Sequence, residues 1–192
     1  MTLWLSRAGK FGEYESKFLT EGKIYATWDG LASDLSTIGS KLALQQLLQS
    51  LDPDAPKGRW ANNAGQLWPF GNEMQVGDWV VLPLKTKPAI AIGEITGNYK
   101  FDPTGPDPFF HSRTVKWLAT DIPRSSFDQD LLYSFGAFMT ICRISRNDAE
   151  QRVRTMAKSA WKPSSLTISP VDTPEALETS VDLELAARDQ IA

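Results

Sequence analysis

The chain has few of the residues that bind transition metals or form disulfides. Its 192 residues include one cysteine and one histidine. The lone Cys142 cannot form an internal disulfide, and the apolar segment around it predicts a buried, inert thiol. His111 has no HExxH or CxxC motif beside it, so we expect it at the surface or in a groove, and we expect no metal and no cofactor.

Long apolar runs are also missing. The longest, such as residues 78–84, fall far short of the roughly 20 residues that a membrane span needs. The N-terminal residues MTLWLSRAGK do not place an apolar segment behind a basic start, as a signal peptide would. We therefore expect a cytoplasmic protein that does not enter a membrane.

Familiar catalytic motifs do not occur. The sequence has no glycine-rich nucleotide motif and no GxSxG nucleophile motif. Restriction-type nucleases need an acidic residue followed downstream by Glu/Gln-x-Lys. The Glu-x-Lys triplets here, at residues 15–17 and 21–23, lie in a predicted helix and at its end rather than on a strand after an aspartate. We expect this chain alone to be no enzyme.

Charge is distributed unevenly along the chain. The formal net charge is −3, but residues 164–192 hold six acidic residues and one basic residue, which leaves 19 basic and 17 acidic residues in residues 1–163. A mildly basic body permits nucleic-acid binding without requiring it. Pro, Ser and Thr at 162–173 predict a linker after a domain at 1–161, and a capped helix at 174–192 is expected to lead toward a further domain or a partner.

Hydrophobic periodicity predicts an α+β domain. Alternating and apolar runs indicate six strands, at residues 2–7, 23–28, 78–84, 89–96, 111–118 and 137–145. Helical spacing and capping residues indicate helices at residues 12–22, 41–51, 59–70, 125–136 and 147–161. Their irregular alternation favours a curved or closed sheet flanked by short helices.

Seven tryptophans are many for a chain of this length. Trp4 and Trp79 lie in predicted strands and are expected to pack in the core. Trp28 ends a predicted strand ahead of the turn Asp29-Gly30, which suits the wall of a ligand pocket, although a core position stays open.

Other segments combine aromatic and amide side chains. The helix predicted at 59–70 offers groups that suit a nucleobase edge: Asn62, Asn63, Gln66 and Trp68. Local capping is the alternative role of these amides. The segment 98–110 adds aromatic rings that could stack on unpaired bases or anchor their own loop: Tyr99, Phe109 and Phe110.

The order of several segments resembles that of a known domain family. These segments are RAGKFGEYE, the strand ending in Trp28-Asp29-Gly30-Leu31, ANNAGQLWPF, MQVGDWVVLP, IAIGEITGNYKFDP, HSRTVKWL and IPR. Together, over about residues 3–145, they resemble the N-terminal domain that precedes Mrr-type catalytic domains in restriction endonucleases. The final segment VDLELAARDQIA resembles the linker helix that enters such a nuclease.

The wider pattern is similar to the PUA-like superfamily, which includes the EVE and YTH domains. Trp28 matches a YTH tryptophan that forms one wall of an aromatic cage, and residues 115–117 with 121–123 resemble a YTH strand and its neighbour. No tryptophan lies between Tyr99 and Phe110, so Tyr99, Phe109 or Phe110 would form the second wall.

The resemblance implies a module that binds double-stranded DNA and flips a modified base into an aromatic pocket. The expected pocket residues are Trp28, Asp29, Asn62, Asn63, Gln66, Trp68, Tyr99, Phe109 and Phe110. The basic residues expected to hold phosphates are Arg7, Lys10, Arg59, Lys100, Arg113 and Arg124. An RNA-binding PUA-like module and a protein-interaction domain are the alternatives.

Overall fold

One mixed sheet organises residues 1–163, the part of the chain that the computed structural model describes. Its strands are β1 (Leu3–Ser6), β2 (Lys23–Tyr25), β3 (Trp79–Pro83), β4 (Ala89–Ile95), β5 (Lys100–Phe101), β6 (His111–Pro123) and β7 (Ile141–Arg143). The helices among these residues are α1 (Glu15–Glu21), α2 (Lys41–Leu51), α3 (Lys57–Asn72), α4 (Gln129–Phe135) and α5 (Ala149–Lys158). Single 3₁₀ turns lie at Leu35–Thr37 and Arg124–Ser126.

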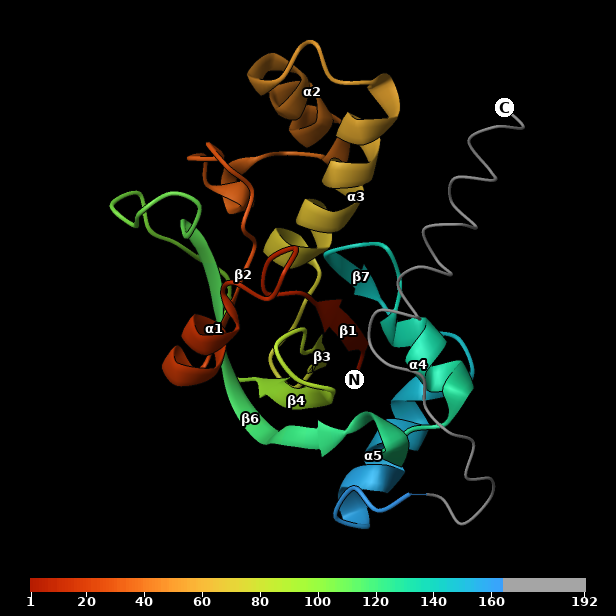
Figure 1. Cartoon of the computed structure of the whole chain (residues 1–192). Coiled ribbons are helices and arrows are strands. Elements are labelled where there is room, and N and C mark those ends of the chain that lie inside the picture. Colours follow the sequence, from red (N-terminus) through yellow and green to blue (C-terminus); the bar gives the residue numbers. More distant parts are fainter. Residues whose placement is uncertain (164–192) are drawn as a thin grey trace, which may run out of the picture.

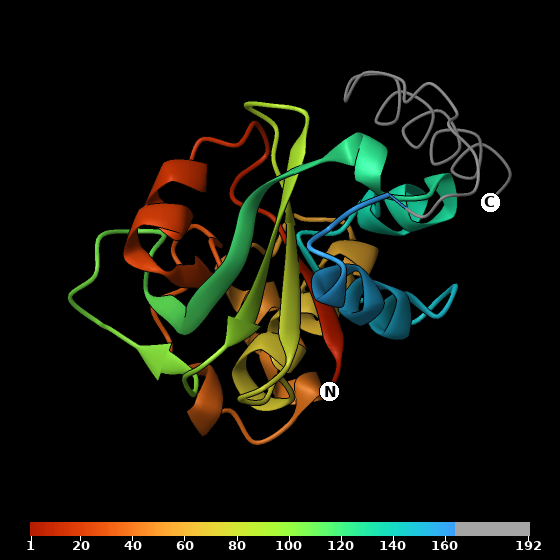
Figure 2. The same ribbon diagram turned by 90° about the horizontal axis from the view of Figure 1, so that it is seen from below.

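The sheet is strongly curled. Its strand order is β2-β6-β4-β3-β1-β7, and β5 pairs with β6 as well. Only β1 and β3 run parallel among these pairs. The long β6 pairs with β2 and β5 near its start and with β4 further on, and the β4–β6 register shifts beside Ile92. Register shifts of this kind bend a strand and increase its twist. Figures 1 and 2 show β6 curving around the body as in half a barrel, so the predicted α+β domain with a curved sheet is confirmed.

Hydrophobic cores lie on both faces of the sheet. Along β1, Trp4 belongs to one core, whereas Leu3 and Leu5 belong to the other, as the two-residue period of a strand requires. Helices α1, α2 and α3 pack on the Trp4 side, and α4 and α5 pack on the Leu3 side. Strand β4 is almost wholly apolar because both of its faces are covered.

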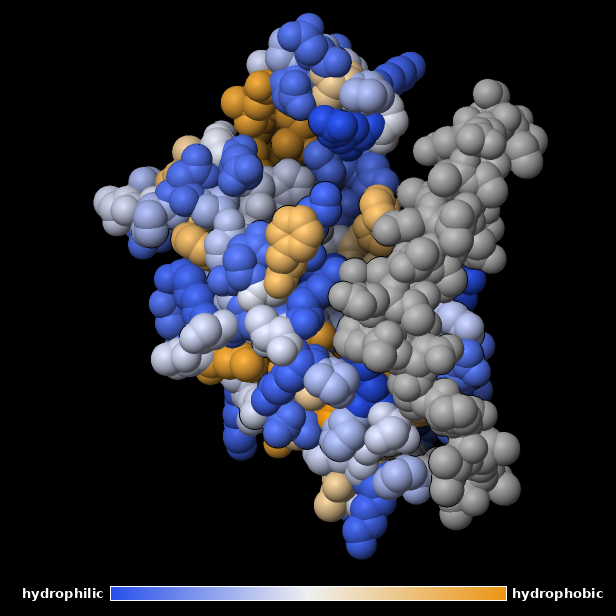
Figure 3. Space-filling model, in the orientation of Figure 1, coloured by the Kyte–Doolittle hydropathy of each residue, from blue (hydrophilic) through white to orange (hydrophobic). Residues whose placement is uncertain are grey.

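The predicted helix ends have identifiable caps. The Ser40 side chain accepts a hydrogen bond from the Ala43 backbone N–H and so begins α2. Gly22 ends α1 in a left-handed conformation, which glycine adopts at little cost. On α2, Leu42 and Leu51 stay exposed, and Figure 3 shows apolar surface over this helix on an otherwise largely hydrophilic face.

Several predicted element boundaries are wrong. Strand β2 ends at Tyr25 rather than at residue 28, and β7 has three residues instead of the predicted segment 137–145. Side chains provide hydrogen-bond partners for the chain just before β7. Arg7 donates to the carbonyl of Ala137, and the backbone N–H of Thr140 donates to the side-chain oxygen of Gln66. The two-residue β5 was not predicted.

Three further expectations concern membrane spans, the lone cysteine and the C-terminal segments. None of the helices within residues 1–163 is long and apolar enough to cross a membrane. Cys142 is half-buried rather than buried, and burial raises the pKa of its thiol, which favours the unreactive protonated form. Most of the predicted linker at 162–173 and the whole predicted helix at 174–192 lie outside the described residues.

Candidate functional site

Trp28 lies in the loop after β2, three residues beyond the end of the strand. Its side chain is half-buried and packs against the core on the Trp4 side. The Leu31 N–H donates to the Trp28 carbonyl at 3.3 Å, which closes a turn around Asp29 and Gly30. Gly30 has a φ of 71°, a conformation that favours glycine. Trp28 therefore packs on the core while part of its side chain stays at the surface, and its role as a pocket wall stays a prediction.

A buried histidine holds this loop in place. His111 is fully buried at the start of β6, so the expectation of a surface or groove position is wrong. Its Nε2 lies 2.7 Å from the Leu31 carbonyl oxygen, and its Nδ1 lies 2.7 Å from the hydroxyl of Tyr99. The same hydroxyl accepts from the Leu35 N–H at 3.0 Å. These contacts fit a neutral ring that donates from Nε2 and accepts at Nδ1, and burial lowers the pKa of His111, which favours that state.

A second clamp joins the loop to the segment between β5 and β6. The Gly30 N–H faces both carboxylate oxygens of Asp107, at 2.9 and 3.1 Å. Asp29 is exposed beside it. Asn72 at the end of α3 adds a long contact of 3.5 Å from its Nδ2 to the Leu35 carbonyl. Side chains from other elements therefore hold the part of the chain that follows Trp28, at Gly30, Leu31 and Leu35.

The predicted aromatic residues are divided between packing contacts. Tyr99 stacks on His111 with ring centroids 5.9 Å apart, and Phe110 is buried against the same ring. Phe109 packs edge-on against Tyr14 and Tyr25 at 5.0 and 5.3 Å. Tyr99 and Phe110 thus pack on His111, which bonds to the Trp28 loop. Phe109 belongs to a cluster with α1 and β2.

The predicted amides of α3 do not act as one group. Gln66 is buried, and its Oε1 accepts from the backbone N–H groups of Thr140 and Ile141 at 2.8 and 3.1 Å. Its Nε2 donates to Asn62 at 2.6 Å. Gln66 therefore holds β7 against α3, and its carbonyl is not open to a base. Asn62 is exposed, and Asn63 and Trp68 are half-buried, with Trp68 packed on the core.

The six predicted phosphate contacts fall into two groups. Three are exposed and accessible: Lys10, Arg59 and Lys100. The others serve the fold, since Arg7 donates to the carbonyls of Phe135 and Ala137 and Arg124 donates to that of Leu84. Arg113 is 3% exposed and donates from Nε to the Phe70 carbonyl at 2.7 Å, so its prediction as a surface phosphate contact is wrong. Burial lowers the pKa of Arg113 to about 10.

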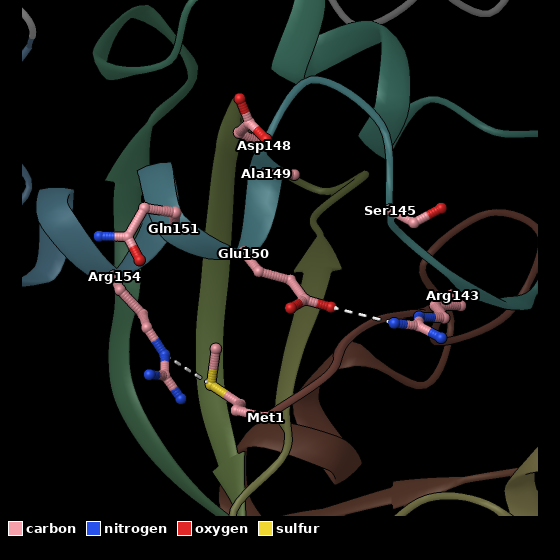
Figure 4. A pocket seen from close by; sticks show the side chains of 8 residues that line it. All are labelled: Met1, Arg143, Ser145, Asp148, Ala149, Glu150, Gln151 and Arg154. Atoms are coloured by element: carbon pink, nitrogen blue, oxygen red, sulfur yellow. Dashed lines mark hydrogen bonds and ion pairs between the residues drawn. The ribbon is translucent and has the colours of Figure 1, made fainter.

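A second region, along α5, has no motif in the sequence that predicts it. Two surface hollows lie along α5, and Figure 4 shows the polar one, with Glu150 directed at Arg143 and Arg154 directed at Met1. Neither hollow is lined by a residue predicted for the base pocket. Trp79, Arg154 and Trp161 line the second hollow but lie far apart or without a motif in the sequence. Only the fold brings β3, β6 and α5 together. Within residues 1–163, no group of three or more His, Cys, Asp or Glu side chains could hold a metal ion.

These features define an α+β domain on a curled mixed sheet, with an aromatic loop held rigidly on one side. The chain belongs to a family described as a domain of unknown function, DUF8426, whose model matches residues 4–143. The match runs from β1 to the end of β7 and therefore covers the whole sheet but not α5. No curated protein and no solved structure matches the chain.

Proposed function

We propose that this chain is a PUA-like module that reads a modified base in duplex DNA, as the recognition part of an Mrr-type modification-dependent restriction endonuclease. The observation that carries the proposal is the fixed presentation of Trp28. His111, Tyr99 and Asp107 hold the backbone that follows Trp28, and the Trp28 side chain packs on the core, so we expect the ring to be preorganised before a ligand arrives. Preorganisation lowers the entropic cost of binding.

The energetics of base reading suit a single half-buried tryptophan supported in this way. Flipping a base out of the duplex costs a few kcal/mol, and stacking on an aromatic face returns roughly 1–3 kcal/mol per base. A methyl group on the base adds about 0.8 kcal/mol when it is buried. A modest preference for modified DNA follows from these magnitudes.

Phosphate binding would come from the exposed basic residues of the predicted set, Lys10, Arg59 and Lys100. Arg59 lies 3.8 Å from Asp52, a loose and exposed ion pair that a phosphate could replace. In this arrangement phosphate contacts give general affinity and Trp28 gives the preference. The helix expected at 174–192 would connect the module to a nuclease domain.

A binding panel tests the proposal. The duplexes share one sequence and carry unmodified cytosine and adenine, 5-methylcytosine, 5-hydroxymethylcytosine or N6-methyladenine. We expect one modified duplex to bind at least several-fold more tightly than the unmodified one, with affinity that falls as salt rises. Equal affinities across the panel would contradict base reading. Stronger competition by RNA of equal length would favour the RNA-binding alternative.

A further inference from the structure

The two hollows along α5 meet at Arg154. One, of about 420 Å³, is lined by Met1, Arg143 and the first turns of α5, as Figure 4 shows. The other, of about 530 Å³, lies where Trp79 of β3, Leu118 of β6 and Trp161 approach α5. Gln151 and Arg154 line both, so the hollows form one groove that is polar at one end and aromatic at the other.

The groove is lined by basic residues from one end to the other, and its carboxylates, Asp148 and Glu150, lie at the polar end. Neither Arg154 nor Lys158 makes an ion pair with any described residue. The contacts of Arg154 are uncharged: its Nε lies 3.0 Å from the Met1 sulfur, and its guanidinium lies 6.0 Å from the Trp79 ring centre. At the polar end, Arg143 shares Glu150 at 3.7 Å with the Leu3 backbone N–H at 3.3 Å. The Arg154 guanidinium, which lines both hollows and has no carboxylate partner among the described residues, could therefore bind an anion.

The aromatic end is shaped by an unusual turn. Ala160 and Trp161 both have positive φ, 54° and 62°, which non-glycine residues adopt rarely. The Trp161 N–H donates to the Met156 carbonyl at 2.8 Å, which turns the chain back along α5. Trp161 is half-buried against the core on the Leu3 side, so its ring is held in the wall of the groove while part of it stays accessible.

We propose that this groove binds a nucleotide, with the base against Trp161 and the phosphate on Arg154. Guanidinium groups match phosphate oxygens in geometry and charge, and tryptophan faces stack on any base. Each hollow falls within the roughly 300–1,000 Å³ typical of small-ligand sites. The groove lies on the opposite face of the sheet from the Trp28 core, so this binding is independent of the proposed DNA reading. The nucleotide is either free or part of a single strand.

Calorimetric titration of the full chain tests this with adenosine 5′-monophosphate, adenosine, inorganic phosphate and a short single-stranded DNA. We expect the monophosphate to bind, and adenosine and phosphate each to bind at least tenfold more weakly. Arg154→Gln should weaken monophosphate binding about tenfold. Trp161→Ala should weaken it about fivefold or more, whereas Trp161→Phe should retain most of it. Tighter binding of the single strand, with the same losses in both variants, identifies a strand as the source; the reverse identifies a free nucleotide.

The matched control is Arg146→Gln, which removes an exposed arginine just before α5 that lines neither hollow. It should leave monophosphate binding unchanged, and circular dichroism should show native folding for every variant. Absence of monophosphate binding at millimolar concentration would overturn the proposal, as would equal losses in the Arg146 and Arg154 variants. Trp28→Ala should also leave this binding unchanged, which separates the failure of either proposal from the failure of the other.

Discussion

Removal of one hydroxyl group should loosen the loop that presents Trp28. In Tyr99→Phe, the Leu35 N–H loses its acceptor and His111 Nδ1 loses its donor. Both Leu35 and His111 are fully buried. A buried polar group without a partner costs about 1–3 kcal/mol, so the two together should lower the free energy of unfolding by about 2–6 kcal/mol.

Thermal and urea unfolding, followed by circular dichroism, measure this loss. For a domain of this size each kcal/mol moves the melting temperature by about 2–4 °C, so Tyr99→Phe should lower it by roughly 4–24 °C. The matched control is Tyr133→Phe, since the Tyr133 side chain is exposed and its hydroxyl accepts a bond only from Gln129, at the surface. This control should change stability by less than about 0.5 kcal/mol. Equal effects of the two substitutions would show that the buried hydrogen bonds of Tyr99 to Leu35 and His111 do not stabilise the fold.

Three further results are expected. The chain has one histidine, and burial lowers the pKa of His111 in the folded state. As pH falls below about 6.5, this histidine is protonated more readily in the unfolded chain than in the folded one. The urea concentration at the unfolding midpoint should therefore decrease between pH 7 and pH 5.5. Gly93→Ala should destabilise the fold by about 1–3 kcal/mol, because an added Cβ would lie 2.4 Å from Val115 and 2.9 Å from Trp117. In the control Gly58→Ala, the added Cβ meets nothing within 4 Å, so the melting temperature should equal or exceed that of the unsubstituted chain. Incubation of plasmid DNA with the chain and Mg²⁺ or Mn²⁺ should leave the DNA intact, and nicking that persists in a preparation free of other nucleases would contradict the expectation that this chain is no enzyme.

Local signals in the sequence predicted much of the fold. The alternation of β1, the apolar runs of β3 and β4 and the caps of α1 and α2 depend on residues close together in the chain, and these elements lie close to where they were predicted. The ends of β2 and β7 depend on long-range partners. Strand β7 is limited by Gln66, which lies more than seventy residues earlier and bonds to Thr140 and Ile141.

The candidate site was less predictable for the same reason. Trp28 was chosen for its place before a turn; the structure puts it in the loop after β2, and its role as a pocket wall stays a prediction. The hydrogen-bond partners of His111 and Arg113 could not be seen from their own neighbours, because Leu31 and Phe70 supply them across the fold. The alternation along β6 did contain a signal, since both residues fall on the buried face together with Val115.

The proposed reading of a modified base depends on Trp28, so binding by the Trp28→Ala variant is the decisive experiment. We expect a loss of roughly 1–3 kcal/mol, about fivefold or more, in affinity for the preferred modified duplex. Weak, salt-sensitive binding to the unmodified duplex should remain, because phosphate contacts supply it. Melting temperature is measured on the same variant, because truncation of a buried tryptophan costs about 3–5 kcal/mol of stability. Equal losses on modified and unmodified DNA, or a stability loss of that size, would place Trp28 in the core and contradict the account.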